Sequence, residues 1–245
     1  MEEKILYVVG IGPGDREDMT IRADRILQRC EVIAGYPVYT DLIKACYPQA
    51  AYITTPMRAE KERCLLALEA AAQGKRTALV SSGDSGIYGL CGLALLLSEQ
   101  FPGVLVRGIP GVTAASSGGA LLGAPLGHDF AVISLSDLLT PKDVIEARLR
   151  AAAASDLILC LYNPESRRRA GYLAWACRIL LEYKPEDTVC GLARNIGRDG
   201  ESSRILTLGQ LLKTPADMFT TVFVGNRETV NRDGKMITPR GYRDV

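Results

Sequence analysis

Short apolar runs alternate with longer segments of helical periodicity in the first half of the chain, and this alternation restricts the fold more than any other feature. The run Ile5–Val9 ends in a glycine-rich stretch and has the character of a buried parallel strand. We expect a helix from Thr20, its cap, to Cys30, with Ile21 facing inward, and then a strand at Val32–Ala34. Such alternation is typical of an α/β fold with a parallel, helix-covered sheet.

The same rhythm continues to residue 112 and then changes. The further helices and strands expected in the first half are Glu60–Gln73, Arg76–Ser81, Gly89–Gln100 and Val104–Arg107. Those expected in the second half are Thr113–Leu122, Phe130–Leu135, Val144–Ala153, Leu157–Tyr162, Ala170–Tyr183, Val189–Ala193, Arg204–Thr207, Leu208–Leu212 and Thr221–Val224. The last strands follow one another so closely that some antiparallel pairing is expected. The sequence therefore predicts two α/β domains, 1–112 with a mainly parallel sheet and 113–245 with a mixed sheet.

Four loops of small residues each follow a predicted strand, at the edge where an open α/β sheet forms its ligand crevice. They are Gly10–Asp15, Ser81–Gly89, Pro110–Ala115 and Leu161–Pro164. Because they come from both halves of the chain, they predict a small-molecule site in a cleft between the two domains.

The first two loops are poorly suited to a diphosphate. Pro13 removes one backbone amide, and Asp15 stands where a dinucleotide-binding pattern has its third glycine. Asp84 in the second loop would repel phosphate, and it has the alternative role of capping the next helix. The loops favour a ligand with hydroxyls, an amine and an adenine edge; for the first loop taken alone, a simple tight turn is the alternative.

Charge and cysteine patterns exclude several classes of function. Lys and Arg total 29 against 28 Asp and Glu, so no broad positive field is available for nucleic acid or an anionic membrane. No apolar run reaches the roughly 20 residues of a spanning helix, and the acidic N-terminus does not resemble a secretory signal, so we expect a cytoplasmic protein. The seven cysteines form no CxxC pair, and no protein-bound metal is expected.

The patterns of common catalytic centres are missing from the sequence. His128 is the single histidine, and no GxSxG, HExxH or GxxxxGK[ST] pattern occurs. We interpret His128 as structural or as a substrate contact rather than as part of a catalytic triad. A chain so poor in acid–base groups is better suited to group transfer between two bound molecules.

The loops together resemble those of the tetrapyrrole methylase family. The resemblance rests on GIGPGD at 10–15, SSGD at 81–84 and PGVTA at 110–114. Within the family, three stretches resemble the precorrin-3B C17-methyltransferases: GHDF at 127–130 leading to SLSDLLTP at 134–141, YNPES at 162–166 with Arg169, and VGN at 224–226 through TPRGY at 238–242. Ser85 departs from the family's usual proline, which predicts a less rigid second loop, and Lys142 replaces a common tryptophan.

The resemblance implies a two-domain enzyme, usually a homodimer, that uses S-adenosylmethionine bound between its domains to methylate C17 of precorrin-3B or cobalt-precorrin-3, with ring contraction, in cobalamin biosynthesis. By correspondence with the family, the cofactor would contact Pro13, Gly83, Asp84, Ile87, Thr113, Ala114, Asn163, Ala193 and Ile196. Any metal would belong to the substrate.

Two further groups of residues are candidates for the chemistry on the tetrapyrrole. Polar groups expected near the cleft, as candidates for assisting ring contraction, are His128, Asp129, Ser136 and Asp137. Cations suited to the carboxylates of a precorrin are Arg58, Arg63, Arg167, Arg169, Arg194, Arg198 and Arg240. The alternative for each arginine is a solvated surface position.

Three other functions are compatible with parts of the sequence. One is a related methylase acting at C11 or C20 of a precorrin or on diphthine, which the run SLSDLLTP disfavours. Another is a nicotinamide-dependent oxidoreductase, disfavoured by Asp84 and by the missing third glycine. The last is a tetrapyrrole carrier without catalysis.

Overall fold

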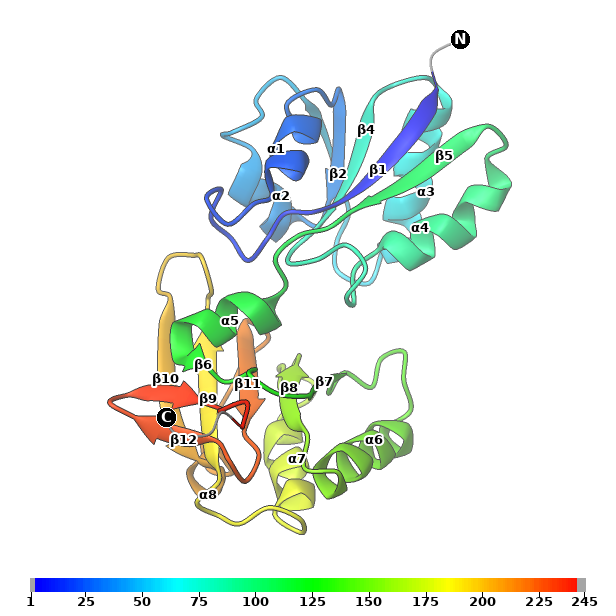
Figure 1. Cartoon of the computed structure of the whole chain (residues 1–245). Helices are drawn as coiled ribbons and strands as arrows, with labels where there is room; N and C mark the ends of the chain where they lie inside the picture. The colour runs from blue at the N-terminus through cyan, green and yellow to red at the C-terminus, as the bar shows by residue number, and fades with distance from the viewer. Residues whose placement is uncertain (1–2, 242–245) are drawn as a thin grey trace. The chain divides into compact units, whose positions relative to one another are not determined.

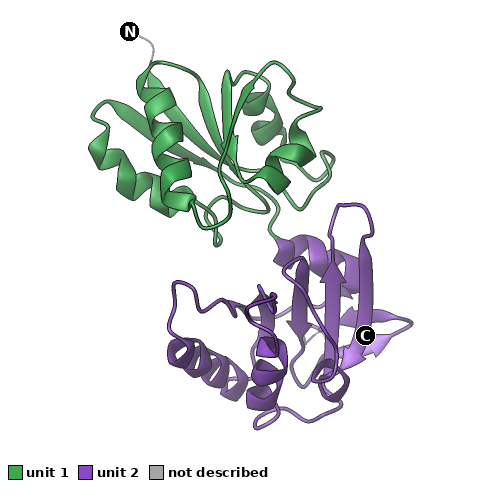
Figure 2. Cartoon of the chain, turned by 180° about the vertical axis from the view of Figure 1, so that it is seen from behind, with its two compact units in different colours: residues 1–113 green, residues 114–245 purple. Residues whose placement is uncertain are grey.

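A computed structural model of the chain describes residues 3–241, so Tyr242 of the C-terminal motif lies outside the described residues. The chain divides into two compact units, residues 1–113 and 114–245, which Figure 2 shows in different colours. Each unit has its own sheet and its own hydrophobic core, and each is described separately below.

Unit 1 is built on a five-stranded sheet in the order β3-β2-β4-β1-β5, and every pairing in it is parallel, as predicted. The strands are β1 Lys4–Gly10, β2 Val32–Gly35, β3 Ala51–Thr54, β4 Thr77–Ser81 and β5 Val104–Ile109. The helices are α1 Ile21–Leu27, α2 Pro37–Ile43, α3 Glu60–Ala72, α4 Cys91–Leu97 and a short 3₁₀ turn at Ser98–Gln100.

Alternating side chains of β1 build both hydrophobic layers of unit 1. Leu6 and Val8 pack with α3 and α4, whereas Tyr7 and Val9 pack with α1 and α2, so helices cover both faces of the sheet (Figure 1). At the start of α1 the Thr20 hydroxyl accepts a hydrogen bond from the Ala23 N–H at 3.1 Å, which confirms the predicted cap. The expectation for Ile21 is wrong, because its side chain is 71% exposed.

Two elements of unit 1 have no counterpart in the sequence prediction. α2 begins at Pro37, a residue suited to the first turn because it has no N–H to leave unsatisfied. β3 forms the edge of the sheet next to β2, and its four residues are half-buried or exposed. Both elements are short and lack a continuous apolar pattern, so local sequence alone does not define them.

Unit 2 contains a second five-stranded sheet, in the order β10-β9-β11-β8-β7. β7 and β8 are parallel and the other pairs are antiparallel, which confirms the predicted mixed sheet. The strands are β7 Phe130–Ser134, β8 Ile158–Tyr162, β9 Val189–Arg194, β10 Ser202–Thr207 and β11 Thr220–Val224. The helices are α5 Ala114–Leu122, α6 Lys142–Ala154, α7 Tyr172–Leu180 and α8 Leu208–Leu211.

The sheet of unit 2 is also covered on both faces. α6, α7 and α8 contribute to the larger core cluster, while α5 packs on the other face around Phe223. On that second face lies a small sheet, β12-β13-β6, made of β12 Val230–Arg232, β13 Lys235–Ile237 and β6 Gly123–Ala124. The sequence did not predict this sheet, because its strands have only two or three residues and β6 pairs with a strand far along the chain.

Candidate functional site

Two loops meet at the carboxyl edge of the unit 1 sheet through backbone hydrogen bonds, and a side chain joins the third loop to them. The Ile11 N–H donates to the Ser81 carbonyl at 2.9 Å. Gly12 and Gly83 exchange two bonds, N–H to O, at 3.1 and 2.7 Å, and form an isolated antiparallel bridge. The first and second loops are therefore one hydrogen-bonded surface rather than two independent turns.

The packing of these loops depends on glycine at specific positions. A Cβ added to Gly111 would lie 2.1 Å from the Gly83 carbonyl oxygen and 2.7 Å from Gly10. A Cβ added to Gly10 would lie 2.6 Å from the same oxygen. Since backbone atoms occupy these positions, a methyl group could enter only if the loops moved apart.

The Asp84 carboxylate links the second loop to the third. Its Oδ1 accepts from the N–H groups of Gly86 and Ile87 at 2.7 and 3.0 Å, and its Oδ2 accepts from the Gly111 N–H at 3.0 Å. These bonds have the form of a cap, but they close a turn, because α4 begins only at Cys91. The helix cap considered as the alternative role of Asp84 is thus a loop clamp that reaches across 27 residues.

The second loop is also fixed by Ser85, contrary to the loss of rigidity expected where the family has proline. The Ser85 side chain is buried, and its hydroxyl donates to the Ile109 carbonyl at 3.0 Å. The neighbouring Ile87 and Tyr88 side chains are exposed at 41% and 58%. The loop therefore exposes two apolar side chains, while the buried Ser85 hydroxyl fixes its backbone.

No lysine or arginine lies in residues 10–15, 81–91 or 110–113, so the charged side chains of these loops are carboxylates. Such an edge can receive a neutral or cationic ligand through backbone groups and apolar contacts, and it is unfavourable for a polyphosphate. Pro13, Gly83, Asp84, Ile87 and Thr113 all belong to the loops of unit 1, whereas Ala114 is the first residue of α5.

Unit 2 places Asn163 at the carboxyl end of β8, with a left-handed backbone at φ 51°. Its amide nitrogen lies 3.0 Å from the Ser134 hydroxyl, and its carbonyl accepts from the Arg169 guanidinium at 2.8 Å. The preceding Tyr162 hydroxyl accepts from the Ala115 N–H at 2.6 Å. Arg169 therefore holds the loop backbone, and the role of Tyr162 was not recognised in the sequence.

The loop between β7 and α6 is fixed at its base by side chains. The Tyr172 hydroxyl donates to the Asp137 carboxylate at 2.6 Å, and this bond raises the pKa of Tyr172. The Ser136 N–H donates to the Ser134 hydroxyl at 3.2 Å. The tip is apolar and exposed, with Leu138 at 55% and Leu139 at 94%.

Lys142 at the start of α6 lies over two aromatic rings. Its ammonium group is 4.7 Å from the centre of the Tyr172 ring and 4.5 Å from that of Trp175. These cation–π contacts add support to the tyrosine that holds Asp137.

His128 and Asp129 precede β7 and are both exposed. The Asp129 N–H donates to His128 Nδ1 at 2.8 Å, and the Asp129 carboxylate lies 3.5 Å from the same nitrogen. The two residues thus form a small polar pair at the opposite end of β7 from Ser136 and Asp137.

The candidate arginines fall into different environments. Arg63 is only 3% exposed and donates to the carbonyls of Thr55 and Pro56. Its side chain is therefore neither solvated at the surface nor accessible to a substrate carboxylate. Arg194 pairs with Asp217 at 2.8 Å, and Arg198 lies over the Phe219 ring. Arg58, Arg167 and Arg240 are exposed, as is Arg194 despite its ion pair.

Ala193 and Ile196 are buried in the core of unit 2 beside Phe223, and Ala193 is paired on both sides with β10 and β11. Among residues 3–241, no group of three or more His, Cys, Asp and Glu side chains has the arrangement of a metal site. Within the same residues, no helix combines the length and apolar character needed to cross a membrane.

Comparison with known proteins gives a consistent result. The family described as Tetrapyrrole (Corrin/Porphyrin) Methylases matches residues 5–212. The chain is 49% identical to the "Probable cobalt-factor III C(17)-methyltransferase" of Salmonella typhimurium, over 97% of this chain and 99% of that protein. It is 42% identical to the "Cobalt-factor III methyltransferase" of Priestia megaterium, over 97% of this chain but 45% of that longer protein. The crystal structure of the methyltransferase CobJ is similar, with TM-score 0.89, 34% identity, and coverage of 96% of this chain and 99% of that chain.

Proposed function

The chain belongs to the tetrapyrrole methylase family, and from this premise we propose that it transfers a methyl group from S-adenosylmethionine to C17 of cobalt-factor III, with ring contraction, in cobalamin biosynthesis. The observation that carries the proposal is 49% identity to the Salmonella relative across almost the full length of both chains. The similarity to CobJ over 96% of this chain supports the same assignment.

The unit 1 loops suit S-adenosylmethionine. When bound, this cofactor supplies a methyl group activated on a positively charged sulfonium. The loops offer backbone donors and acceptors with carboxylates in place of cations, which disfavours a phosphate ligand and accommodates the sulfonium charge. We propose contacts from Pro13, Gly83, Asp84, Ile87 and Thr113 in unit 1 and from Ala114, Asn163, Ala193 and Ile196 in unit 2.

Methyl transfer from sulfonium to carbon is an in-line displacement, so the chain's main task is alignment. Fixed positioning of two reactants can lower a barrier by about 7–11 kcal/mol. The hydrogen-bonded loops of unit 1 and the anchored Asn163 provide fixed geometry without any mobile catalytic side chain. This accounts for how a site with one histidine can catalyse the transfer.

Ring contraction needs proton transfers, and we propose that His128, Asp129, Ser136 and Asp137 assist them. Asp137 is already hydrogen-bonded to the Tyr172 hydroxyl, so the two side chains are placed to exchange a proton with a bound ligand. The exposed Arg58, Arg167 and Arg240 are proposed partners for the substrate's carboxylates. Arg194 and Arg198 are less available, because Arg194 pairs with Asp217 and Arg198 lies over the Phe219 ring. We further propose that the protein is a cytoplasmic homodimer.

The test is an anaerobic incubation of the protein and S-adenosylmethionine with cobalt-factor III and, separately, with metal-free precorrin-3B. Mass spectrometry and NMR of the tetrapyrrole should show one added methyl group at C17 with the cobalt-bearing substrate. Methylation of precorrin-3B alone would assign the metal-free substrate instead. Failure with both substrates, with cofactor binding intact, would contradict the proposal.

A separate variant tests the assignment of His128. His128→Ala should bind both ligands and lower the rate of ring contraction. A normal rate of contraction in this variant would remove His128 from the proposed group.

A further inference from the structure

A groove of about 690 Å³ runs along α1 on the surface of unit 1. Its lining residues are Tyr7, Ile21, Arg22, Arg25, Ile26, Arg29, Cys30 and Arg76. None of them belongs to the three glycine-rich loops, and the volume is within the usual range of small-molecule sites. The groove is therefore separate from the proposed cofactor site.

Two of the four arginines, Arg22 and Arg25, come from α1, and a third, Arg29, follows its C-terminal end. Arg22, Arg25 and Arg29 are three and four residues apart, so their side chains lie along the same side of α1 and its C-terminal end. None of these three side chains has a hydrogen bond or ion pair with residues 3–241. Like charges at this spacing repel one another. Within residues 3–241, no ion pair of these side chains offsets the repulsion.

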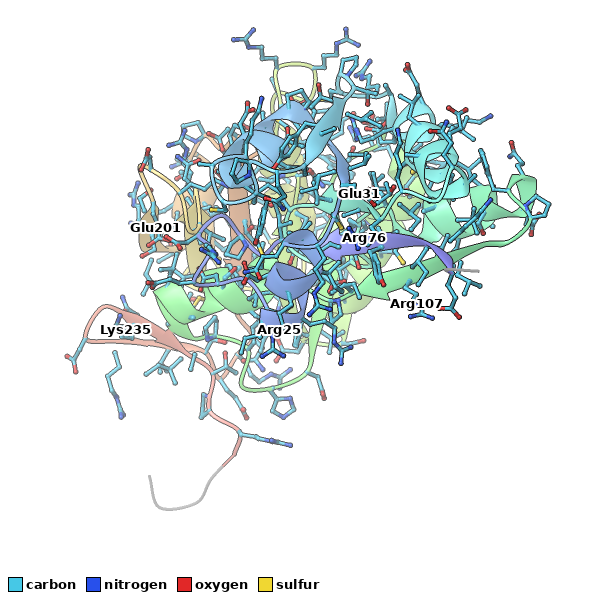
Figure 3. All side chains as sticks on the ribbon, turned by 90° about the horizontal axis from the view of Figure 1, so that it is seen from above. Arg25, Glu31, Arg76, Arg107, Glu201 and Lys235 are labelled. Carbon is cyan, nitrogen blue, oxygen red and sulfur yellow. The ribbon has the colours of Figure 1, made fainter. Side chains whose placement is uncertain are left out.

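The nearby carboxylates are engaged elsewhere. Asp24 of α1 bonds to Arg16 and to the Tyr47 hydroxyl, away from the groove. Glu31 lies 3.5 Å from Arg76 in a pair whose two side chains are more than half exposed. Figure 3 labels Arg25 and Arg76 on unit 1, with Glu31 beside Arg76. Exposed pairs of this kind are weak, so Glu31 leaves Arg76 available to a stronger anion.

The floor between the arginines is apolar. Tyr7 and Ile26 are half-buried and Cys30 is buried, while Ile21 forms an exposed rim. Burial raises the pKa of the Cys30 thiol to about 12, so the thiol adds no negative charge to the groove. A ligand that fits must combine an apolar body with several negative groups.

We propose that this groove binds a polycarboxylate with an apolar ring body, at a site additional to the catalytic one. Arg22 and Arg25 stand one turn apart on α1, Arg29 follows the end of the helix and Arg76 precedes β4, so the four arginines reach the groove from separate points along it. The phosphates of a nucleotide share bridging oxygens and are too closely spaced to reach all the guanidiniums, whereas carboxylates around a ring are spread apart. Guanidinium groups bind each carboxylate through two parallel hydrogen bonds.

The test uses the full chain and uroporphyrin III, an octacarboxylate ring, as the probe. Isothermal titration should show two sites in the wild-type protein, one of which weakens at least tenfold in Arg25→Gln/Arg29→Gln. The variant should keep its affinity for S-adenosylmethionine and its rate of methyl transfer. A matched control is Arg148→Gln/Arg178→Gln, which removes the same charge from exposed positions in unit 2 and should leave both sites intact.

Three results would overturn the proposal. Equal weakening in the two double variants would mean only general attraction between charges. Equally tight competition by ATP would show a site for anions without selection for carboxylates on a ring. A single site, together with dissociation of a dimer in Arg25→Gln/Arg29→Gln, would show that a second copy of the chain covers the groove. If the proposed function were wrong, the wild-type protein would transfer no methyl group. The titration of the groove with uroporphyrin III would still show the binding that Arg25→Gln/Arg29→Gln weakens.

Discussion

The carboxyl edges of the two sheets are constructed by different means. In unit 1, backbone groups of two loops bond directly to each other, glycines allow a third loop to pack closely against them, and the Asp84 carboxylate joins it to the second. In unit 2, the corresponding edge of β7 and β8 is held by side chains, chiefly Asn163, Ser134, Asp137 and Tyr172. Backbone contacts persist when side chains are exchanged, except where a Cβ replaces the hydrogen of a closely packed glycine, whereas side-chain contacts can be exchanged one at a time. The first edge is therefore sensitive to atoms added at its glycines, and the second to the loss of single hydrogen-bonding groups.

The most severe test of this comparison is Gly111→Ala. The new methyl group would overlap the Gly83 carbonyl, and separation of the loops should cost about 3 kcal/mol of unfolding free energy. Urea unfolding and titration with S-adenosylmethionine measure the two consequences. Gly92→Ala in α4 is the control, because its Cβ would enter open space and should be neutral or slightly stabilising. Equal stability of the two variants would show that the loops tolerate a Cβ.

A large side-chain effect in unit 2 is expected away from its carboxyl edge, at Asp156. Its carboxylate lies 2.9 Å from the ammonium group of Lys184, which is 3% exposed, and 2.8 Å from exposed Arg227. Asp156→Asn leaves Lys184 buried without its counter-ion and should cost about 2 kcal/mol. Arg227→Gln is the control and should cost much less.

The same aspartate predicts a pH dependence. Burial alone would raise the pKa of Asp156, but the hydrogen bonds from Lys184 and Arg227 outweigh it and lower the pKa below 3.8. The stabilisation is therefore complete above the unfolded pKa and is lost as pH falls through the lower folded value. Acid unfolding from pH 5 to 2 should be less steep in Asp156→Asn, and an identical profile would exclude this contribution.

Asp84→Asn tests the side chain that joins the second and third loops of the unit 1 edge. The amide would direct an N–H group at a backbone donor, either Gly111 or the pair Gly86 and Ile87, with a cost of about 1.5 kcal/mol. Asp15→Asn, which affects one exposed bond to the Glu17 N–H, is the control and should be nearly silent. If both variants unfold alike, the clamp across the loops contributes nothing.

Tyr172→Phe removes the hydrogen bond to Asp137 at an exposed position and should cost at most about 1 kcal/mol. Turnover of the tetrapyrrole should fall while S-adenosylmethionine binding stays normal, because only the unit 2 edge changes. A double-mutant cycle with Asp137→Asn measures the coupling free energy between the two side chains. Strictly additive effects on stability would show that the two side chains do not interact.

The smallest effect on stability is expected for Leu139→Ser, within about 0.5 kcal/mol, because the side chain contacts mainly solvent. We expect a raised KM for the tetrapyrrole from loss of an apolar contact. Leu96→Ser, on an exposed face of α4, should leave KM unchanged. A KM change shared by both would point to altered solubility.

Local pattern was sufficient for the elements that carry strong apolar runs, such as β1 and β8, and for the mixed pairing of the second sheet. It was insufficient for α2 and for the sheet formed by β6, β12 and β13, whose pairing depends on distant residues. Loop composition identified positions of close backbone approach, confirmed at Gly12 and Gly83. The partner of Asp84 at Gly111 and the burial of Arg63 depend on tertiary packing, which no local pattern encodes.

The position of β1 between β4 and β5 has a consequence for synthesis of the chain. β1 leaves the ribosome early, but its two neighbours are complete only at Ser81 and Ile109. The apolar stretch Ile5–Val9 has two unpaired edges until Ser81 is made and one until Ile109 is made, a condition that favours association between nascent chains. Unit 1 must therefore wait for nearly its whole length before it can close its sheet, and chaperone binding would be most useful in that interval.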